Sequence, residues 1–315
     1  MKILITGAAG NLGSFLAQHL LPSDHELNLL IHNRKLPYDT ASHRNASLFR
    51  ADLGDPNSLK LACEGVACIV HFAGVLFAPR PERFLPITNI DYVENLVEVG
   101  LEAGVGKFIL ISFPHVEGES TPEKPATGRM NGQPGSVHAQ TRLAAEQLLF
   151  QRSEDTQMTP IALRPGMIYA KGVLMIEAAR WLLARRLMGV WREPTWIHLL
   201  SLPDFLTCTT AAIEKDNISG VYNLGDDEPT TLQEFLDAIA EQWDYAKPWR
   251  GPRWLFPLAG GLTEVGAAIL NKPSPLTRDF IRIGMASYVS NTERMKAELL
   301  PELEYPNLQS GLSLL

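Results

Sequence analysis

The stretch Ile3-Leu-Ile-Thr-Gly-Ala-Ala-Gly-Asn-Leu-Gly13 decides the fold of this chain. A short apolar run predicts a buried strand, and a helical pattern of leucines follows the turn. Glycines in that turn permit a tight bend and let the backbone approach a pyrophosphate, while the helix start offers free N–H groups to the phosphates. We therefore predict a dinucleotide-binding turn whose contacts come from Gly7, Gly10, Asn11, Leu12 and Gly13.

Short runs rich in Ile, Val and Leu recur through the first half of the chain. They fall at residues 3–5, 27–31, 47–49, 68–72, 108–111 and 161–163. Helical patterns lie between most of these runs. Strands that are apolar throughout and alternate with helices indicate a parallel sheet that is covered on both faces. Right-handed crossovers then predict an α/β fold with a doubly wound parallel sheet of the Rossmann type.

The pattern changes beyond about residue 165, where tryptophans and prolines concentrate and irregular stretches separate the helices. We expect residues 1–165 to form a dinucleotide-binding domain to which residues 196–225 return. Residues 166–315 then form a smaller, mixed substrate-binding domain. The proline- and glycine-rich stretch 119–135 is expected to be a long loop.

Composition excludes several classes of function. The 315 residues carry 28 Lys and Arg against 35 Asp and Glu, a net charge of −7, so we expect neither a nucleic acid nor a membrane as a partner. Cys63, Cys68 and Cys208 cannot all pair, and their spacing is not that of a zinc site, so we expect no metal. Free thiols and the lack of a signal-peptide pattern favour a cytoplasmic protein. We expect its partner to be a small-molecule substrate.

The turn and several later motifs resemble the extended short-chain dehydrogenase/reductase family, the NAD-dependent epimerase/dehydratases. Thr-Gly-x-x-Gly-x-x-Gly is similar to the family's cofactor loop. The resemblance implies adenine contacts at Asp52 and Leu53. It places the strand end after His71 beside the phosphates and ribose, with contacts from Phe72, Ala73 and Gly74. The segment Arg164-Pro-Gly-Met-Ile-Tyr169 matches the family's segment over the nicotinamide, which implies contacts from Pro165, Gly166 and Met167.

The end of the second strand bears on the choice of cofactor. An acidic residue there accepts the ribose 2′-hydroxyl of NAD, whereas an arginine suits the 2′-phosphate of NADP. This strand ends Ile31-His-Asn33-Arg34-Lys35, without a carboxylate. We therefore predict NADP as the cofactor, bound in part by Asn33 and Arg34, with NAD as the alternative.

The resemblance also locates the family's catalytic positions, and all of them differ here. Thr141-Arg142-Leu-Ala-Ala-Glu146 resembles Ser-Lys-x-x-x-Glu, which places Arg142 at the lysine and His138 at the tyrosine. The second serine of the family's Ser-Ser pair is replaced by Phe113, which leaves Ser112 as the neighbouring hydroxyl. We predict a degenerate Ser/Tyr-x-x-x-Lys site with His138, Arg142 and Ser112 as catalytic candidates. His115, Glu117 and Ser136 are further groups that can substitute for the missing ones.

Two interpretations of this altered site compete. In the first, His138 transfers a proton with a pKa near 6.5, in an oxidoreductase or epimerase. In the second, the chain is a non-redox NADP-binding sensor, or an isomerase or cyclase without net hydride transfer. The segment 164–169 looks more like the reductase and hydroxysteroid branch than the nucleotide-sugar branch. That likeness implies a small, apolar carbonyl or alcohol as the substrate.

Overall fold

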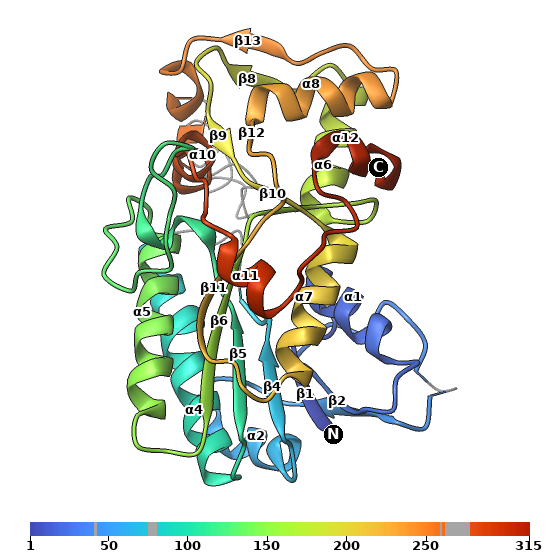
Figure 1. Cartoon of the computed structure of the whole chain (residues 1–315), viewed down its shortest axis with the longest axis vertical. Coiled ribbons are helices and arrows are strands. Elements are labelled where there is room, and N and C mark those ends of the chain that lie inside the picture. The colour runs from blue at the N-terminus through green and yellow to red at the C-terminus, as the bar shows by residue number, and fades with distance from the viewer. Residues whose placement is uncertain (41–42, 75–80, 259, 262–277) are drawn as a thin grey trace.

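A seven-stranded sheet forms the centre of the larger lobe (Figure 1). The computed structural model describes residues 1–40, 43–74, 81–258, 260–261 and 278–315. All neighbouring strands of the sheet run parallel, in the order β11-β6-β5-β4-β1-β2-β3. The strands are β1 Lys2–Thr6, β2 Glu26–Ile31, β3 Ala46–Arg50, β4 Cys68–His71, β5 Lys107–Ile111, β6 Thr159–Pro165 and β11 Gly220–Leu224. The predicted doubly wound parallel sheet is confirmed.

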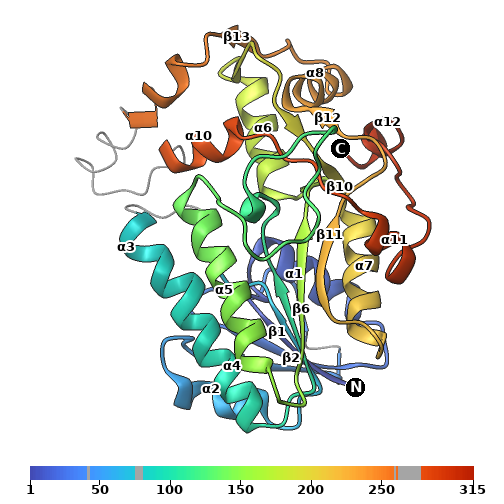
Figure 2. The ribbon, with the colours of Figure 1, turned by 60° about the vertical axis from the view of Figure 1, so that its left-hand side comes forward.

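Helices cover both faces of the sheet (Figure 2). One face carries α1 (Asn11–Leu20) and α7 (Leu202–Glu214), which contact each other. The opposite face carries α2 (Pro56–Cys63), α4 (Tyr92–Glu102) and α5 (Val137–Ser153). The short α3 (Pro81–Pro86) and the π-helical turn η1 (Ile87–Asp91) precede α4. A 3-10 turn, η2 (Pro114–Glu117), follows β5.

Alternation along each strand explains the continuous apolar runs. Ile3 and Ile5 of β1 belong to the core under α1 and α7, while Leu4 between them belongs to the core under α2, α4 and α5. In β5, Ile109 and Phe108 divide in the same way between the two cores. Because side chains of a strand alternate between its faces, a strand buried on both faces must be apolar at every position.

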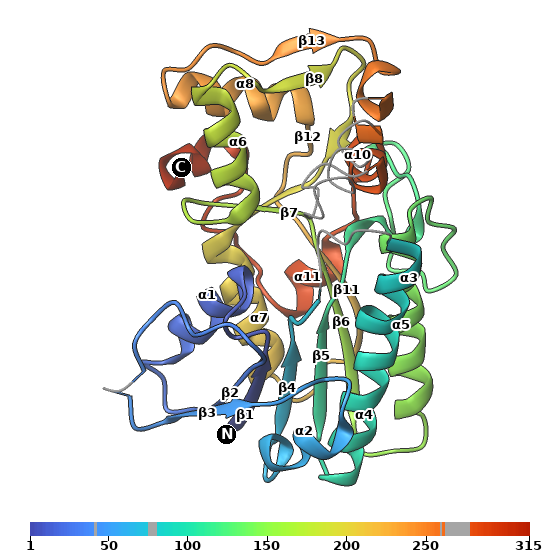
Figure 3. The same ribbon diagram turned by 180° about the vertical axis from the view of Figure 1, so that it is seen from behind.

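A second, smaller lobe lies above the carboxyl ends of the strands (Figure 3). It holds three small strand pairs: β7 with β10 and β8 with β13, both parallel, and β9 with β12, antiparallel. These strands are β7 Met167–Tyr169, β8 Gly189–Trp191, β9 Trp196–Ile197, β10 Leu199–Ser201, β12 Thr230–Thr231 and β13 Trp249–Gly251. Further helices that the structure bounds are α6 Leu174–Ala184, α8 Leu232–Gln242, α10 Arg278–Met285, α11 Glu293–Glu298, α12 Leu308–Gly311 and η3 Leu312–Leu314.

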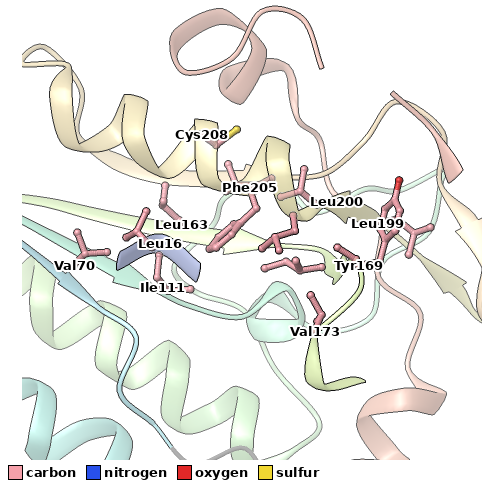
Figure 4. Close-up of a cluster of buried hydrophobic side chains, with 14 of the residues drawn as sticks. Leu16, Val70, Ile111, Leu163, Tyr169, Val173, Leu199, Leu200, Phe205 and Cys208 are labelled. Carbon is pink, nitrogen blue, oxygen red and sulfur yellow. The ribbon is translucent and has the colours of Figure 1, made fainter. Parts of the chain in front are cut away.

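One hydrophobic core joins the two lobes (Figure 4). Leu16 of α1, Val70 of β4 and Phe205 of α7 pack in the same cluster as Tyr169 and Leu199 of the small lobe. Contiguous apolar packing of this kind resists hinge motion, because opening the lobes would expose the cluster to water. Among the described residues, no helix has the length and apolarity needed to cross a membrane. All three cysteines are buried and unpaired, as expected.

The predicted long loop at 119–135 is confirmed as irregular backbone. It is tied to the chain that follows α10. Ala126 N–H donates to Val289 O at 2.8 Å, and Asn291 N–H donates to Ala126 O at 2.8 Å. Glu117 accepts hydrogen bonds from the N–H groups of Thr127, at 3.1 Å, and Gly128, at 2.6 Å. Buried backbone groups of the loop therefore find partners despite the absence of regular structure.

Candidate active site

The predicted site residues meet at the carboxyl ends of the strands, beside β1. This strand pairs with β2 on one side and with β4 on the other, and the chain order reverses there. In open α/β sheets, ligands bind in the crevice outside such a switch point. The predicted contacts come from the segments that follow β1 to β6 and from the amino-terminal parts of α1 and α5.

The glycine turn leaves no room for side chains. Gly7 adopts a φ of +70°, which favours glycine, and its carbonyl accepts a hydrogen bond from Gly10 N–H at 2.7 Å. A Cβ on Gly13 would lie 2.4 Å from Gly7 O, and one on Gly10 would lie 2.9 Å from the same oxygen. The helix start thus comes unusually close to the strand end, as a pyrophosphate turn requires.

The amino terminus of α1 is open to an anion. Gly10 provides no side-chain cap, and the first turn holds no acidic residue. The Asn11 side chain is engaged elsewhere: its Nδ2 donates to Gly172 O at 2.8 Å, and its Oδ1 accepts from Leu174 N–H at 2.8 Å. Asn11 therefore links the turn to the small lobe, and a phosphate contact at Asn11 or Leu12 would come from the backbone.

The predicted adenine end is exposed. Asn33 and Arg34 follow β2 at the surface, and Arg34 makes no hydrogen bond or ion pair with any residue that the structure describes. Asp52 Oδ1 accepts from Gly54 N–H at 2.9 Å, and Asp52 Oδ2 lies 3.8 Å from His32 Nε2. Leu53 is nearly buried, and its carbonyl accepts from Asn95 Nδ2 at 2.8 Å.

His71 fixes the end of β4. Its Nδ1 lies 2.9 Å from Thr6 Oγ1, which also accepts from Ala73 N–H at 3.4 Å. Complete burial and the nearby Arg142 charge lower the pKa of His71 to about 3, so the ring is neutral at physiological pH. These bonds hold Phe72 and Ala73 beside the glycine turn, where a Cβ on Gly7 would lie 2.9 Å from Ala73 N.

Arg142 and Gly74 lie against each other at the same edge. A Cβ on Gly74 would stand 2.2 Å from Arg142 Nη2. Arg142 is 8% exposed, and its Nη1 donates to Ile111 O at 3.4 Å. Burial lowers the pKa of Arg142 to about 10, so the guanidinium stays charged at neutral pH. A cation therefore stands beside the predicted phosphate and ribose contacts.

An aromatic stack occupies the centre of the predicted catalytic site. The Phe113 ring lies 4.9 Å from the His138 ring, edge to face, and 4.9 Å from the His115 ring, on which it stacks. The His115 ring lies 4.4 Å from that of Tyr288. The His115 Nε2 lies 3.2 Å from Ala286 O, so this nitrogen carries the proton, and Nδ1 has no partner among the described residues.

Both histidines of the stack are neutral. Burial, followed by the charges of Arg142 and His115, lowers the pKa of His138 to about 3. Burial lowers the pKa of His115 to about 4. The expectation that His138 titrates near 6.5 is therefore wrong, because that value belongs to a solvated imidazole and His138 is only 4% exposed.

Ser112 belongs to a buried network of hydrogen bonds and ion pairs. Its hydroxyl donates to Glu146 Oε1, and Glu146 accepts from Arg164 Nε at 3.0 Å. Arg164 Nη1 donates to Glu117 at 2.9 Å. All of these side chains are buried. The Ser112 hydroxyl and the Glu117 carboxylate are thus engaged by buried partners, and their predicted roles in the site stay predictions.

The segment after β6 closes one side of the crevice. Pro165 and Gly166 are buried, and Met167 is partly exposed. Gly166 N–H donates to Leu224 O at 2.8 Å, and a Cβ on Gly166 would lie 2.2 Å from His198 O. Glycine is required here because β7 and β10 come together at this point. Met167 is thus the member of this trio that is open to a ligand.

Some residues that lie beside the candidate site could not be predicted from sequence patterns. Tyr288 reaches the stack from a segment far along the chain. Asn89 Nδ2, from the π-helical turn η1, donates to Thr141 Oγ1 at 2.9 Å, while Asn89 Oδ1 has no partner among the described residues. Local π-helical turns occur often at functional sites. Within the described ranges, no group of His, Cys, Asp or Glu side chains is arranged to hold a metal ion.

Comparison with known protein families shows which family the chain belongs to. The model of the family described as "NAD dependent epimerase/dehydratase family" matches residues 3–225. This match spans the glycine turn, most of the stack and the segment after β6. The chain belongs to the NAD dependent epimerase/dehydratase family. The resemblance predicted from the motifs is thereby confirmed.

Two curated relatives are about 25% identical to the chain over the residues that align. The 2-alkyl-3-oxoalkanoate reductase of Stenotrophomonas maltophilia is 25% identical over 250 residues, which cover 76% of this chain and 74% of that protein. The 3 beta-hydroxysteroid dehydrogenase/Delta 5→4-isomerase of Mycobacterium tuberculosis is 23% identical over 274 residues, which cover 77% of this chain and 70% of that protein.

Solved structures share the epimerase/dehydratase fold. MoeE5 in complex with UDP-glucuronic acid and NAD superposes with a TM-score of 0.77 at 21% identity, over 100% of this chain and 97% of MoeE5. The UDP-glucose 4-epimerase of Thermus thermophilus in complex with NAD gives a TM-score of 0.75 at 20% identity, with the same coverage. These structural neighbours bind NAD.

Proposed function

We propose that the chain binds a nicotinamide dinucleotide across Gly7–Gly13 and acts as an oxidoreductase or epimerase on a small carbonyl or alcohol. The observation that carries the proposal is the convergence of the glycine turn, the open start of α1 and the Arg142 guanidinium at one sheet edge. When bound, the nicotinamide ring supplies a hydride donor or acceptor. Gly7, Gly10 and Gly13 would hold the pyrophosphate, and Arg142 would face the ribose and phosphates beside Gly74.

The second part of the proposal is a preference for NADP. Arg34 and Lys35 are exposed after β2, and no carboxylate ends that strand. Because the Arg34 guanidinium has no partner among the described residues, binding a 2′-phosphate would break no existing ion pair. The solved relatives named above hold NAD, so direct comparison of the two dinucleotides is the informative experiment.

The chemistry of the proposed site differs from that of a tyrosine and lysine pair. A neutral His138 has one donor and one acceptor nitrogen, and it lies on the same face of α5 as Arg142 and Glu146, at intervals of four residues. It can hydrogen-bond a substrate oxygen without first losing a proton. Phe113 in contact with its ring excludes water from that position. The names of the curated relatives, an oxoalkanoate reductase and a hydroxysteroid dehydrogenase, support a substrate with an apolar portion.

A panel of ketones and secondary alcohols, with NADPH or NADP, tests the proposal through the absorbance of the reduced nicotinamide. We expect slow turnover by the parent protein and its loss in His138→Phe, which retains an aromatic ring against Phe113. Full activity of a folded His138→Phe protein would show that His138 is structural. Dinucleotide affinity measured on the same variant separates loss of chemistry from loss of binding.

The alternative is a dinucleotide-binding sensor without redox chemistry. Phe113 in place of the hydroxyl, together with the engagement of Ser112 by Glu146, favours it. A combined His138→Tyr, Arg142→Lys and Phe113→Ser variant rebuilds the family pattern. Gain of ketone reduction in this variant, with none in a dinucleotide-binding parent, would show that the parent binds the dinucleotide without redox chemistry, as a sensor or a non-redox isomerase or cyclase does. Equal turnover in both proteins would exclude it.

A further inference from the structure

A cavity of about 580 Å³ adjoins the aromatic stack. It lies between the turn after β5, the amino end of α5 and α10, which sits above α5 in Figure 2. His115 lines it at the end nearest Phe113 and His138. This volume is in the range of small-molecule sites. A ligand in the cavity would contact His115, whose ring stacks on Phe113.

The charge of the cavity wall is unusual for this chain. The described residues that line it include three exposed arginines, Arg253, Arg278 and Arg282, and the carboxylate of Glu119. The Asp279 carboxylate on α10 interacts with the charge of Arg282. The chain as a whole carries a net charge of −7, so a basic composition does not account for this cluster. Guanidinium groups brought together in a cavity raise the local concentration of anions and bind carboxylate or phosphate oxygens in pairs.

The backbone N–H groups at the amino end of α5 are hydrogen-bonded within the protein, so the arginine side chains are the main groups that can bind an anion in this cavity. The start of α5 is already satisfied, because Val137 N–H donates to Asp279 Oδ1 at 3.1 Å and Ala139 N–H donates to Ser136 Oγ at 3.2 Å. Arg253 uses its Nη2 to donate to Met285 O at 2.8 Å, which orients the group and leaves its other N–H donors for a ligand.

We propose that this cavity binds the substrate, and that the substrate is a small alcohol or ketone bearing an anionic oxygen group held by Arg253 and Arg282. The reacting carbon then lies at the end lined by His115, where Nδ1 of that ring lacks a hydrogen-bond donor among the described residues. This assignment names the substrate class of the proposed function. It rests on that function for which end of the ligand lies near His115. Carboxylate and phosphate share the recognition chemistry, so both belong in the test.

Equilibrium binding to the full chain tests this proposal without turnover. The probes are 3-hydroxyoctanoate with octane-1,3-diol as its neutral counterpart, and glycerol 3-phosphate with glycerol. We expect one anion to bind about tenfold more tightly than its neutral counterpart, and Arg282→Gln and Arg253→Gln each to remove most of that difference. The preferred anion identifies carboxylate or phosphate. Arg44→Gln, an exposed arginine beside the amino end of β3, is the matched control and should bind like the parent.

Equal affinity for anions and neutral counterparts would overturn the assignment, as would undiminished anion binding in both folded variants. Melting temperatures of the variants identify any loss of folding. Dinucleotide titration of the same samples keeps the two proposals apart. Dinucleotide binding without an anion preference overturns the cavity assignment alone. An arginine-dependent anion preference without dinucleotide binding supports the cavity assignment and overturns the proposed function.

Discussion

Arg142 Nη2 occupies the space directly over Gly74, where a Cβ would stand 2.2 Å from it. The two residues belong to α5 and to the end of β4, and their contact holds a cation beside the glycine turn. A side chain at position 74 would therefore displace the Arg142 guanidinium from its present place. This relationship joins the predicted cofactor contacts to the predicted catalytic helix.

Gly74→Ala should displace the Arg142 guanidinium and weaken dinucleotide binding about tenfold, the effect of losing one charge-assisted contact. Isothermal titration calorimetry measures the change. Gly106→Ala is the control, because a Cβ at position 106 meets only Ala67 O at 3.7 Å. An unchanged dissociation constant in Gly74→Ala would mean that Arg142 does not contribute to binding.

Arg34→Ala should reduce the preference for NADP over NAD by about tenfold, because the side chain would pair with the 2′-phosphate that only NADP carries. Affinity for NAD should hardly change. Arg44→Ala removes an equivalent exposed charge at the opposite end of the sheet and should leave both affinities as they are. Equal parental affinities for the two dinucleotides would contradict the assignment of Arg34.

Much of this fold could be predicted from the sequence, because two-sided burial makes the central positions of β1, β4 and β5 apolar. The register of α5 could also be predicted, since His138, Arg142 and Glu146 recur every fourth residue. The side-chain contacts that decide the chemistry of the site could not be predicted from the sequence. The Ser112 hydroxyl turns to Glu146, and burial of His138 depends on packing between distant segments. The arginines of α10 line the cavity beside α5, and a long-range hydrogen bond from Val137 N–H to Asp279 Oδ1 joins these two helices, which no local pattern encodes.

Ser112→Ala should lower the free energy of unfolding by about 1–3 kcal/mol, because the buried Glu146 carboxylate would lose a donor. Urea denaturation measures this loss. Dinucleotide affinity should stay within about twofold of the parent's, as the hydroxyl faces the Arg164 network and not the crevice. Strongly weakened dinucleotide binding with normal stability would instead place Ser112 in the site.

Asp226 should make stability depend on pH. Its carboxylate oxygens are buried without hydrogen-bond partners among the described residues, and burial raises its pKa to about 8. The unfolded chain loses this proton near pH 4, whereas the folded chain keeps it up to about pH 8. The unfolded state therefore binds fewer protons over that interval, and stability falls as pH rises through it.

Asp226→Asn should remove this contribution, so its melting temperature relative to the parent's should rise between about pH 5 and pH 8. Asp227→Asn is the control, because this neighbouring carboxylate is exposed and pairs with Lys296 at 2.5 Å. The control should not reproduce the trend. A constant difference between parent and Asp226→Asn across the pH range would show that Asp226 ionises alike in the folded and unfolded chains.

Calorimetric titration of NADP into the parent, Gly13→Ala and Gly106→Ala tests the central claim, that a dinucleotide lies across the glycine turn. A Cβ at position 13 would stand 2.4 Å from Gly7 O, so Gly13→Ala must open the turn. Gly10→Ala, with a Cβ 2.9 Å from that oxygen, is a milder second variant should the first fail to fold. We predict binding by the parent and Gly106→Ala, and at least about a hundredfold loss in a folded glycine-turn variant. Parental affinity in that variant, or a parent that binds neither NADP nor NAD, would contradict the account.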